Sequence, residues 1–246
     1  NQPISSGLGV DHFHGNVEIG RMLCDLYNLN DQIRFQHAEL NPEFLEDLLK
    51  RSNWEICHLL SVHHHLIRDI GIDKTKRIFQ ALHENVKTVA IEQGMLTDDE
   101  FQDWTGGVQR FASGSFARML EMLQSCGIPR DNCFPIGIGM YLSGNRDDNE
   151  GWKRVMVGFS RTSVSNPVSG VTERHHKNGI LMEIIETGTP RDGEVWKHAV
   201  SGGSHAEREF KALTKLSEHD GFPRVLASEE TSTDASRGLI RMKRLD

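Results

Sequence analysis

The sequence predicts an α/β fold in which a parallel sheet is covered by helices, followed by a smaller α+β part. Apolar, β-branched runs alternate with segments of helical period through the first 93 residues. Beyond residue 151 short strand-like runs are separated by Gly, Asn and Pro, which is typical of antiparallel strands. Hydrophobic residues at 37% and charged residues at 26% indicate a chain that folds throughout.

The first part alternates strands with helices in chain order. Strands are expected over residues 7–11, 33–38, 54–60 and 86–92, and helices over 17–27, 42–49 and 73–83. The strand over 54–60 is predicted to be buried. Pro42 lies in the first turn of its helix, where its missing N–H is not needed. The first helix is expected to have an apolar side made of Val17, Ile19, Met22, Leu23, Leu26 and Tyr27.

The remainder of the chain is less regular. We expect a loop or lid with Trp104 over 97–107, a helix over 115–126 and an antiparallel edge of two short strands at 133–136 and 140–143. A charged, turn-rich linker over 145–151 then divides the chain into domains 1–145 and 146–246. In the second domain we predict one helix, over 204–216, and five strands, over 154–159, 180–185, 194–198, 222–226 and 239–242.

Charge and composition exclude several classes of function. Residues 1–145 carry 12 Lys and Arg against 19 Asp and Glu, a net charge of −7, while residues 146–246 carry 16 of each. An acidic first part argues against nucleic-acid binding. No apolar run is long enough to span a bilayer, so membrane insertion is not expected. The cysteines lack metal-site spacing, and we expect reduced thiols in a cytoplasmic protein.

Three successive histidines, His63, His64 and His65, follow the third predicted strand. In an open α/β sheet, ligands bind outside the carboxyl ends of the strands, and a histidine there can carry a proton near neutral pH. A solvated cluster that opens a helix is an equal alternative for these residues alone. Glu92 ends the next strand at the same edge, which favours a cleft.

Asp11 ends the first strand, before a helix. A carboxylate in this place can accept hydrogen bonds from both ribose hydroxyls of a nucleotide-like cofactor, although a helix cap is the more common role. The triplet His37-Ala38-Glu39 follows the second strand, where an adenine ring commonly meets the sheet edge. A structural role for the triplet is at least as well supported.

Several motifs resemble one family. The strand end Gly9-Val10-Asp11, followed by residues 16–21, resembles the second motif of Rossmann-like S-adenosylmethionine-dependent methyltransferases. This sequence is similar in more detail to the bacterial bifunctional methyltransferase–kinases that cap polymannose O-antigen chains. That resemblance covers residues 7–145 and rests on residues 60–65, 71–73, 76–77, 90–92, 140–143 and 145.

This resemblance implies a Rossmann-like methyltransferase sheet and a cofactor, S-adenosylmethionine. Asp11 would bind the ribose, the Ala38-Glu39 turn would lie near the adenine, and Ser61 would belong to the cofactor site. His64 and His65 would be the catalytic residues that face the methyl group and the substrate, without a metal. His63 stands where the family has an aromatic residue.

The resemblance extends to the second part as a kinase-like small lobe. Lys197 resembles the strand lysine that holds nucleotide phosphates, and Glu209 resembles the helix glutamate that pairs with it. Residues 222–226 and 242–245 resemble the strands that lead to the hinge between the two lobes. ATP and magnesium are expected only in a complete kinase half.

Two family features are absent from the sequence. No strand with a glycine-rich turn precedes Asp11, so the sheet is expected to be incomplete at its amino end. No His-Arg-Asp loop and no Asp-Phe-Gly motif occurs, and we expect no phosphorylation by this chain. The simplest interpretation is an internal piece of a longer protein.

The leading hypothesis is therefore methyl transfer to an oxygen of a glycan or glycan-phosphate terminus, or of another small acceptor, by the complete protein. Such a protein would lie in the cytoplasm, with peripheral association at the inner face of the membrane. A non-catalytic scaffold or binding protein that retains the fold is the alternative. An NAD-dependent oxidoreductase is less favoured, because it also needs the glycine-rich turn.

Overall fold

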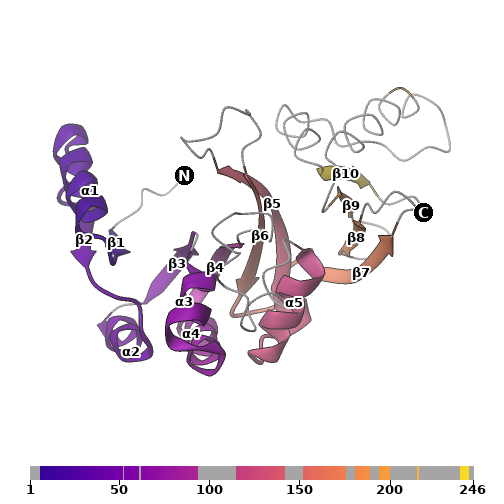
Figure 1. Cartoon of the computed structure of the whole chain (residues 1–246), viewed down its shortest axis with the longest axis horizontal. Coiled ribbons are helices and arrows are strands. Elements are labelled where there is room, and N and C mark those ends of the chain that lie inside the picture. The colour runs from indigo at the N-terminus through magenta and orange to yellow at the C-terminus, as the bar shows by residue number, and fades with distance from the viewer. Residues whose placement is uncertain are drawn as a thin grey trace. The chain divides into compact units, whose positions relative to one another are not determined.

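The computed structural model describes residues 6–51, 53–60, 62–93, 115–141, 152–175, 181–188, 194–199, 215 and 239–243 (Figure 1). The chain divides into two compact units, residues 1–52 and 53–246. Each unit is described by itself below. None of the helices in the described ranges is long and apolar enough to cross a membrane.

The first unit is a β-α-β-α segment. Strand β1 (Gly7–Asp11) is followed by α1 (His14–Tyr27), β2 (Ile33–His37) and α2 (Pro42–Arg51). The strands β1 and β2 pair in parallel, with Asp11 opposite His37. These elements agree with the predicted ones, and the carboxyl ends of both strands lie at one edge.

The packing of α1 differs from the expected one. Its buried residues are Val17, Gly20 and Cys24, which recur at helical spacing. The larger apolar residues expected with Val17 are exposed instead: Ile19, Met22, Leu23, Leu26 and Tyr27. On the buried side, the Phe35 ring of β2 lies against Gly20, which has no side chain to displace it.

The second unit begins with the sheet that we call the central sheet, in the order β3-β4-β6-β5. Strands β3 and β4 pair in parallel, and β6 and β5 continue the sheet in antiparallel pairing. In chain order, the strands of this sheet and the helices between them are β3 (Trp54–Leu59), α3 (His63–Ile70), α4 (Ile72–Asn85), β4 (Val86–Gln93), α5 (Phe116–Ser125), the short helix η2 (Arg130–Asn132), β5 (Cys133–Tyr141) and β6 (Trp152–Ser160).

Three expectations for this sheet are corrected. The two short strands predicted at 133–136 and 140–143 are one strand, β5, with an irregularity between Pro135 and Gly137. The strand β6, expected in the second domain, is hydrogen-bonded between β4 and β5. The strand β3 is half exposed rather than buried: Glu55, Ile56 and His58 are exposed, and Leu59 is its buried residue. Within the described residues β3 pairs only with β4.

A second, antiparallel sheet follows, in the order β10-β9-β8-β7. Its strands are β7 (Val168–His175), β8 (Leu181–Thr187), β9 (Glu194–Ala199) and β10 (Leu239–Lys243). The strand β7 was not predicted. The loop with Trp104, the linker over 145–151, most of the helix over 204–216 and the strand over 222–226 lie outside the described residues.

Candidate functional site

The carboxyl edge of β1 and β2 holds three of the predicted cofactor residues. Asp11 ends β1, and Ala38 directly follows β2. The backbone N–H of Ala38 donates a hydrogen bond to the backbone carbonyl of Asp11 at 3.1 Å. Glu39 is the next residue and is exposed. The structure therefore brings Asp11 and the Ala38-Glu39 turn together, as the strand pairing implies.

The Asp11 carboxylate is held by its own turn. The backbone N–H of Phe13 donates to Oδ1 at 2.8 Å, and the Asn16 side-chain amide donates to Oδ2 at 2.9 Å. Each carboxylate oxygen has about two acceptor positions. One position on each oxygen is occupied in this way, so each oxygen retains capacity for one further donor. This arrangement is a helix-entry turn, and it also presents a fixed pair of acceptors.

The pKa of Asp11 is lowered from its ordinary value. Partial burial raises this pKa, but the hydrogen bonds from Phe13 and Asn16 and the charges of His12 and His37 together lower it by more. The carboxylate is consequently ionised at neutral pH. It can accept hydrogen bonds from a vicinal diol at this edge.

Histidines surround this carboxylate. The Nδ1 atom of His12 lies 3.6 Å from Oδ1 of Asp11. Nε2 of His37 lies 2.9 Å from the backbone carbonyl of His12, and since a carbonyl only accepts, His37 is the donor. The rings of His14 and His37 meet edge to face, with centroids 5.5 Å apart. The hydrogen bond of Asn16 to Asp11 and the effect of the His37 charge on Asp11 were not predicted, and the latter depends on the paired strand ends.

The histidine run opens α3, which begins at His63. His63 is completely buried, and its ring meets that of Phe79 edge to face at a centroid distance of 6.3 Å. Burial lowers the pKa of His63 to about 4, with a further lowering from His65 and an opposing effect of a hydrogen bond with the Glu92 backbone. His63 is therefore a neutral core residue.

The two predicted catalytic histidines lie in the first turn of α3, beside His63. His65 is half-buried. The backbone of His64 belongs to α3, but its side chain lies outside the described part of the structure, as does all of Ser61. Their catalytic roles stay predictions. The division after residue 52 places Asp11, Ala38 and Glu39 in the first unit and these histidines in the second.

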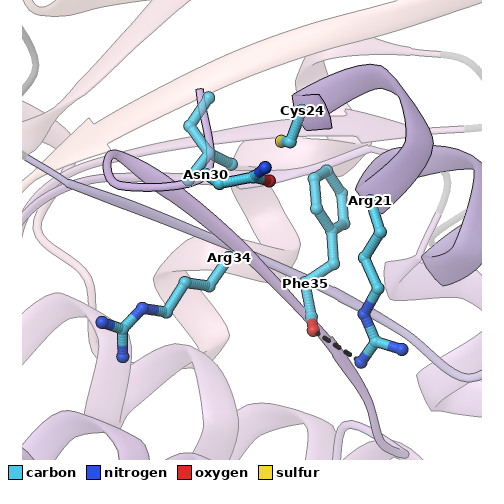
Figure 2. A pocket seen from close by; sticks show the side chains of 6 residues that line it. Arg21, Cys24, Asn30, Arg34 and Phe35 are labelled. Atoms are coloured by element: carbon cyan, nitrogen blue, oxygen red, sulfur yellow. Dashed lines mark hydrogen bonds between the residues drawn. The ribbon is translucent and has the colours of Figure 1, made fainter. Parts of the chain in front are cut away.

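A pocket of about 290 Å³ lies elsewhere in the first unit (Figure 2). It is lined by Arg21, Cys24, Asn30, Ile33, Arg34 and Phe35. The guanidinium of Arg21 donates to the Phe35 carbonyl at 3.1 Å, whereas Arg34 extends away from the other labelled side chains. Since β2 begins at Ile33, the pocket belongs to the opposite end of the strand from Ala38. None of the predicted site residues lines it.

The kinase-like residues are only partly described. The backbone of Lys197 lies in β9, opposite Ile240 of β10 and Ile184 of β8. Its side chain and the whole of Glu209 fall outside the described residues, so their pairing stays a prediction. Within the same limits, no group of three His, Cys, Asp or Glu side chains is arranged to hold a metal ion.

No family model and no curated protein matches this chain. Among solved structures, WbdD with the kinase inhibitor LY294002 has 19% identity and a TM-score of 0.43, over 97% of this chain and 51% of that one. The bifunctional kinase-methyltransferase WbdD has 18% identity and a TM-score of 0.41, over 97% and 52%.

The methyltransferase domain of the bacterial protein CtHen1-CN has 17% identity and a TM-score of 0.40, over 63% of this chain and 78% of that one. The chain spans about half the length of the WbdD structures that it matches. With identities below 20% and TM-scores below 0.5, these likenesses assign no activity to the chain.

Proposed function

We propose that this chain is part of an S-adenosylmethionine-dependent methyltransferase joined to a kinase-like domain. The observation that carries the proposal is the Asp11 carboxylate, which is ionised, fixed by two hydrogen bonds and placed at the shared carboxyl edge of two parallel strands. A vicinal diol such as a ribose fits the remaining acceptor position on each carboxylate oxygen.

The complete protein would transfer a methyl group to an oxygen at the end of a glycan or its phosphate. Bound S-adenosylmethionine supplies an electrophilic methyl group. The chain's residues orient the reactants, with Asp11 on the ribose and the Ala38-Glu39 turn beside the adenine. His64 and His65 would face the acceptor, where an imidazole can take up the proton of the attacking hydroxyl. Ser61 is assigned to the cofactor site by resemblance alone.

The kinase-like assignment is a proposal for the second sheet. Lys197 would hold nucleotide phosphates and pair with Glu209, while ATP and magnesium require the remaining kinase elements. A glycan-capping parent protein would act in the cytoplasm at the inner face of the membrane.

Calorimetric titration of S-adenosylhomocysteine into the whole chain tests the methyltransferase proposal. We expect binding that Asp11→Ala abolishes. Asp25→Ala is a matched control, because Asp25 also accepts a hydrogen bond from an asparagine, Asn30, but at the other end of α1. Binding that survives Asp11→Ala contradicts the proposed ribose contact. A folded chain that does not bind supports the alternative, a scaffold that retains the fold.

A further inference from the structure

A buried glutamate joins the second sheet to a helix of the central sheet. Glu183 lies in the middle of β8 and has an exposed fraction of 0%. Its carboxylate accepts hydrogen bonds from the Ser115 hydroxyl and from the backbone N–H groups of Phe116 and Ala117, the last two at 2.9 Å each. These groups form the amino end of α5, where free N–H groups and the helix dipole favour an anion.

Two further contacts join the second sheet to α5 and to η2. The ring of Trp196 in β9 meets that of Phe116 edge to face, with centroids 6.5 Å apart. Beyond α5, the Nε atom of Arg130 in η2 donates to the Val168 carbonyl of β7 at 3.1 Å. The second sheet is therefore attached to the segment from Ser115 to η2 by its strands β7, β8 and β9.

The helix α5 also packs on the central sheet through its other buried residues. Met119, Met122 and Leu123 are buried, and α5 contacts β6. In β6, the ring of Phe159 meets that of Phe79 at 6.3 Å, and Phe79 in turn meets His63. Ring contacts thus connect β6, which α5 contacts, with the helix that carries the histidine run.

We propose that Glu183 is a latch that couples the opening of the second sheet to the opening of the first turn of α5. Separation of β8 from α5 would break three hydrogen bonds to one carboxylate, and hydrogen bonds to a charged group stabilise more than those between neutral groups, so both elements would lose stability together. The opening of the second sheet and the loss of the first turn of α5 are consequently linked, so α5 keeps its first turn only while the second sheet is in place. This inference does not rest on the proposed methyltransferase activity.

Hydrogen exchange on the whole chain tests the latch. We compare the wild type with Glu183→Gln, which keeps the size of the side chain but removes its charge and turns one acceptor into a donor. Exchange is expected to be at least about tenfold faster in two places together, at the start of α5 and in β8 and β9. Glu186→Gln is the matched control, because Glu186 lies on the opposite face of the same strand, and it should leave both places unchanged.

A milder variant keeps the test decisive if Glu183→Gln fails to fold. Ser115→Ala removes one of the three donors and leaves both backbone hydrogen bonds to Glu183. It also removes the hydroxyl that accepts from the Arg118 backbone N–H, so some acceleration in α5 is expected from the lost cap, and the exchange in β8 and β9 decides the test. Smaller accelerations in α5 and in the second sheet together support the latch. Faster exchange in α5 alone shows a local helix cap and overturns the proposal, as does unchanged exchange in both places.

Discussion

The ring of Phe35 in β2 occupies the space that a side chain on Gly20 of α1 would need. A Cβ atom on Gly20 would lie 2.5 Å from the ring atom Cε1, and a Cβ on Gly9 of β1 would lie equally close to the same atom. The edge of the ring is therefore held between helix and strand. This contact sets the distance between α1 and the two strands whose ends carry Asp11 and Ala38.

We predict that Gly20→Ala destabilises the first unit. Alanine favours a helix by about 1 kcal/mol over glycine, but overpacking against the Phe35 ring, which also lies against Gly9, costs about 1–3 kcal/mol, so a net loss is expected. Gly15→Ala in the same helix is the control, because its Cβ meets only the ring of Phe13, which is 60% exposed and can move. Denaturant unfolding gives the free energy of unfolding of both variants. Equal effects of the two substitutions would refute the packing argument.

Asn16 is predicted to keep the pKa of Asp11 low. Asn16→Ala removes the hydrogen bond to Oδ2, so the pKa of Asp11 should rise towards its ordinary value. The Asp11 carboxyl resonance in a pH titration by NMR reports this change. Asn30→Ala, which removes an amide from Asp25 instead, should leave Asp11 unaffected. An unchanged titration of Asp11 in Asn16→Ala would show that the side-chain bond is unimportant.

His63 should make the stability of the second unit depend on pH. Its pKa is about 4 in the folded chain against 6.5 as the ordinary value, so the unfolded chain binds a proton first as the pH falls. Stability is therefore lost between pH 6.5 and pH 4, by roughly 3 kcal/mol in total if the shift is fully expressed.

The variant His63→Phe removes this dependence while it keeps a ring against Phe79. Denaturant unfolding at pH 7 and pH 5 should show that the variant loses less free energy of unfolding between these two pH values than the wild type does. His58→Gln, a change at an exposed histidine of β3, should retain the wild-type loss. A variant with the same loss as the wild type would mean that His63 is not the responsible group.

Local sequence patterns predicted much of the fold. The features that they missed depend on contacts between residues far apart in the sequence. The helix α1 was expected from its period, but the side that is buried is the one that meets Phe35, fifteen residues beyond Gly20. The strand β6 was assigned to the second domain because a charged, turn-rich segment precedes it, whereas its apolar surface fits between β4 and β5.

The candidate site was predictable to the same degree. Asp11 and the Ala38-Glu39 turn follow from strand ends, and the parallel pairing of β1 and β2 brings them together. The buried role of His63 could not be separated from that of His64 and His65, because only the start of α3 decides which histidine faces Phe79. Glu183 gave no signal, since its partners lie 66 to 68 residues away.

The most direct test of the proposed cofactor site is an NMR titration of the whole chain with S-adenosylhomocysteine, read at the backbone amides of Phe13 and Ala38. These two N–H groups bond the carboxylate and the carbonyl of Asp11, respectively. A ribose on Asp11 should shift both resonances with one common affinity, and Asp11→Asn should weaken that affinity. Shifts confined to the pocket residues Arg21 and Asn30, or none at Phe13 and Ala38, would contradict the account.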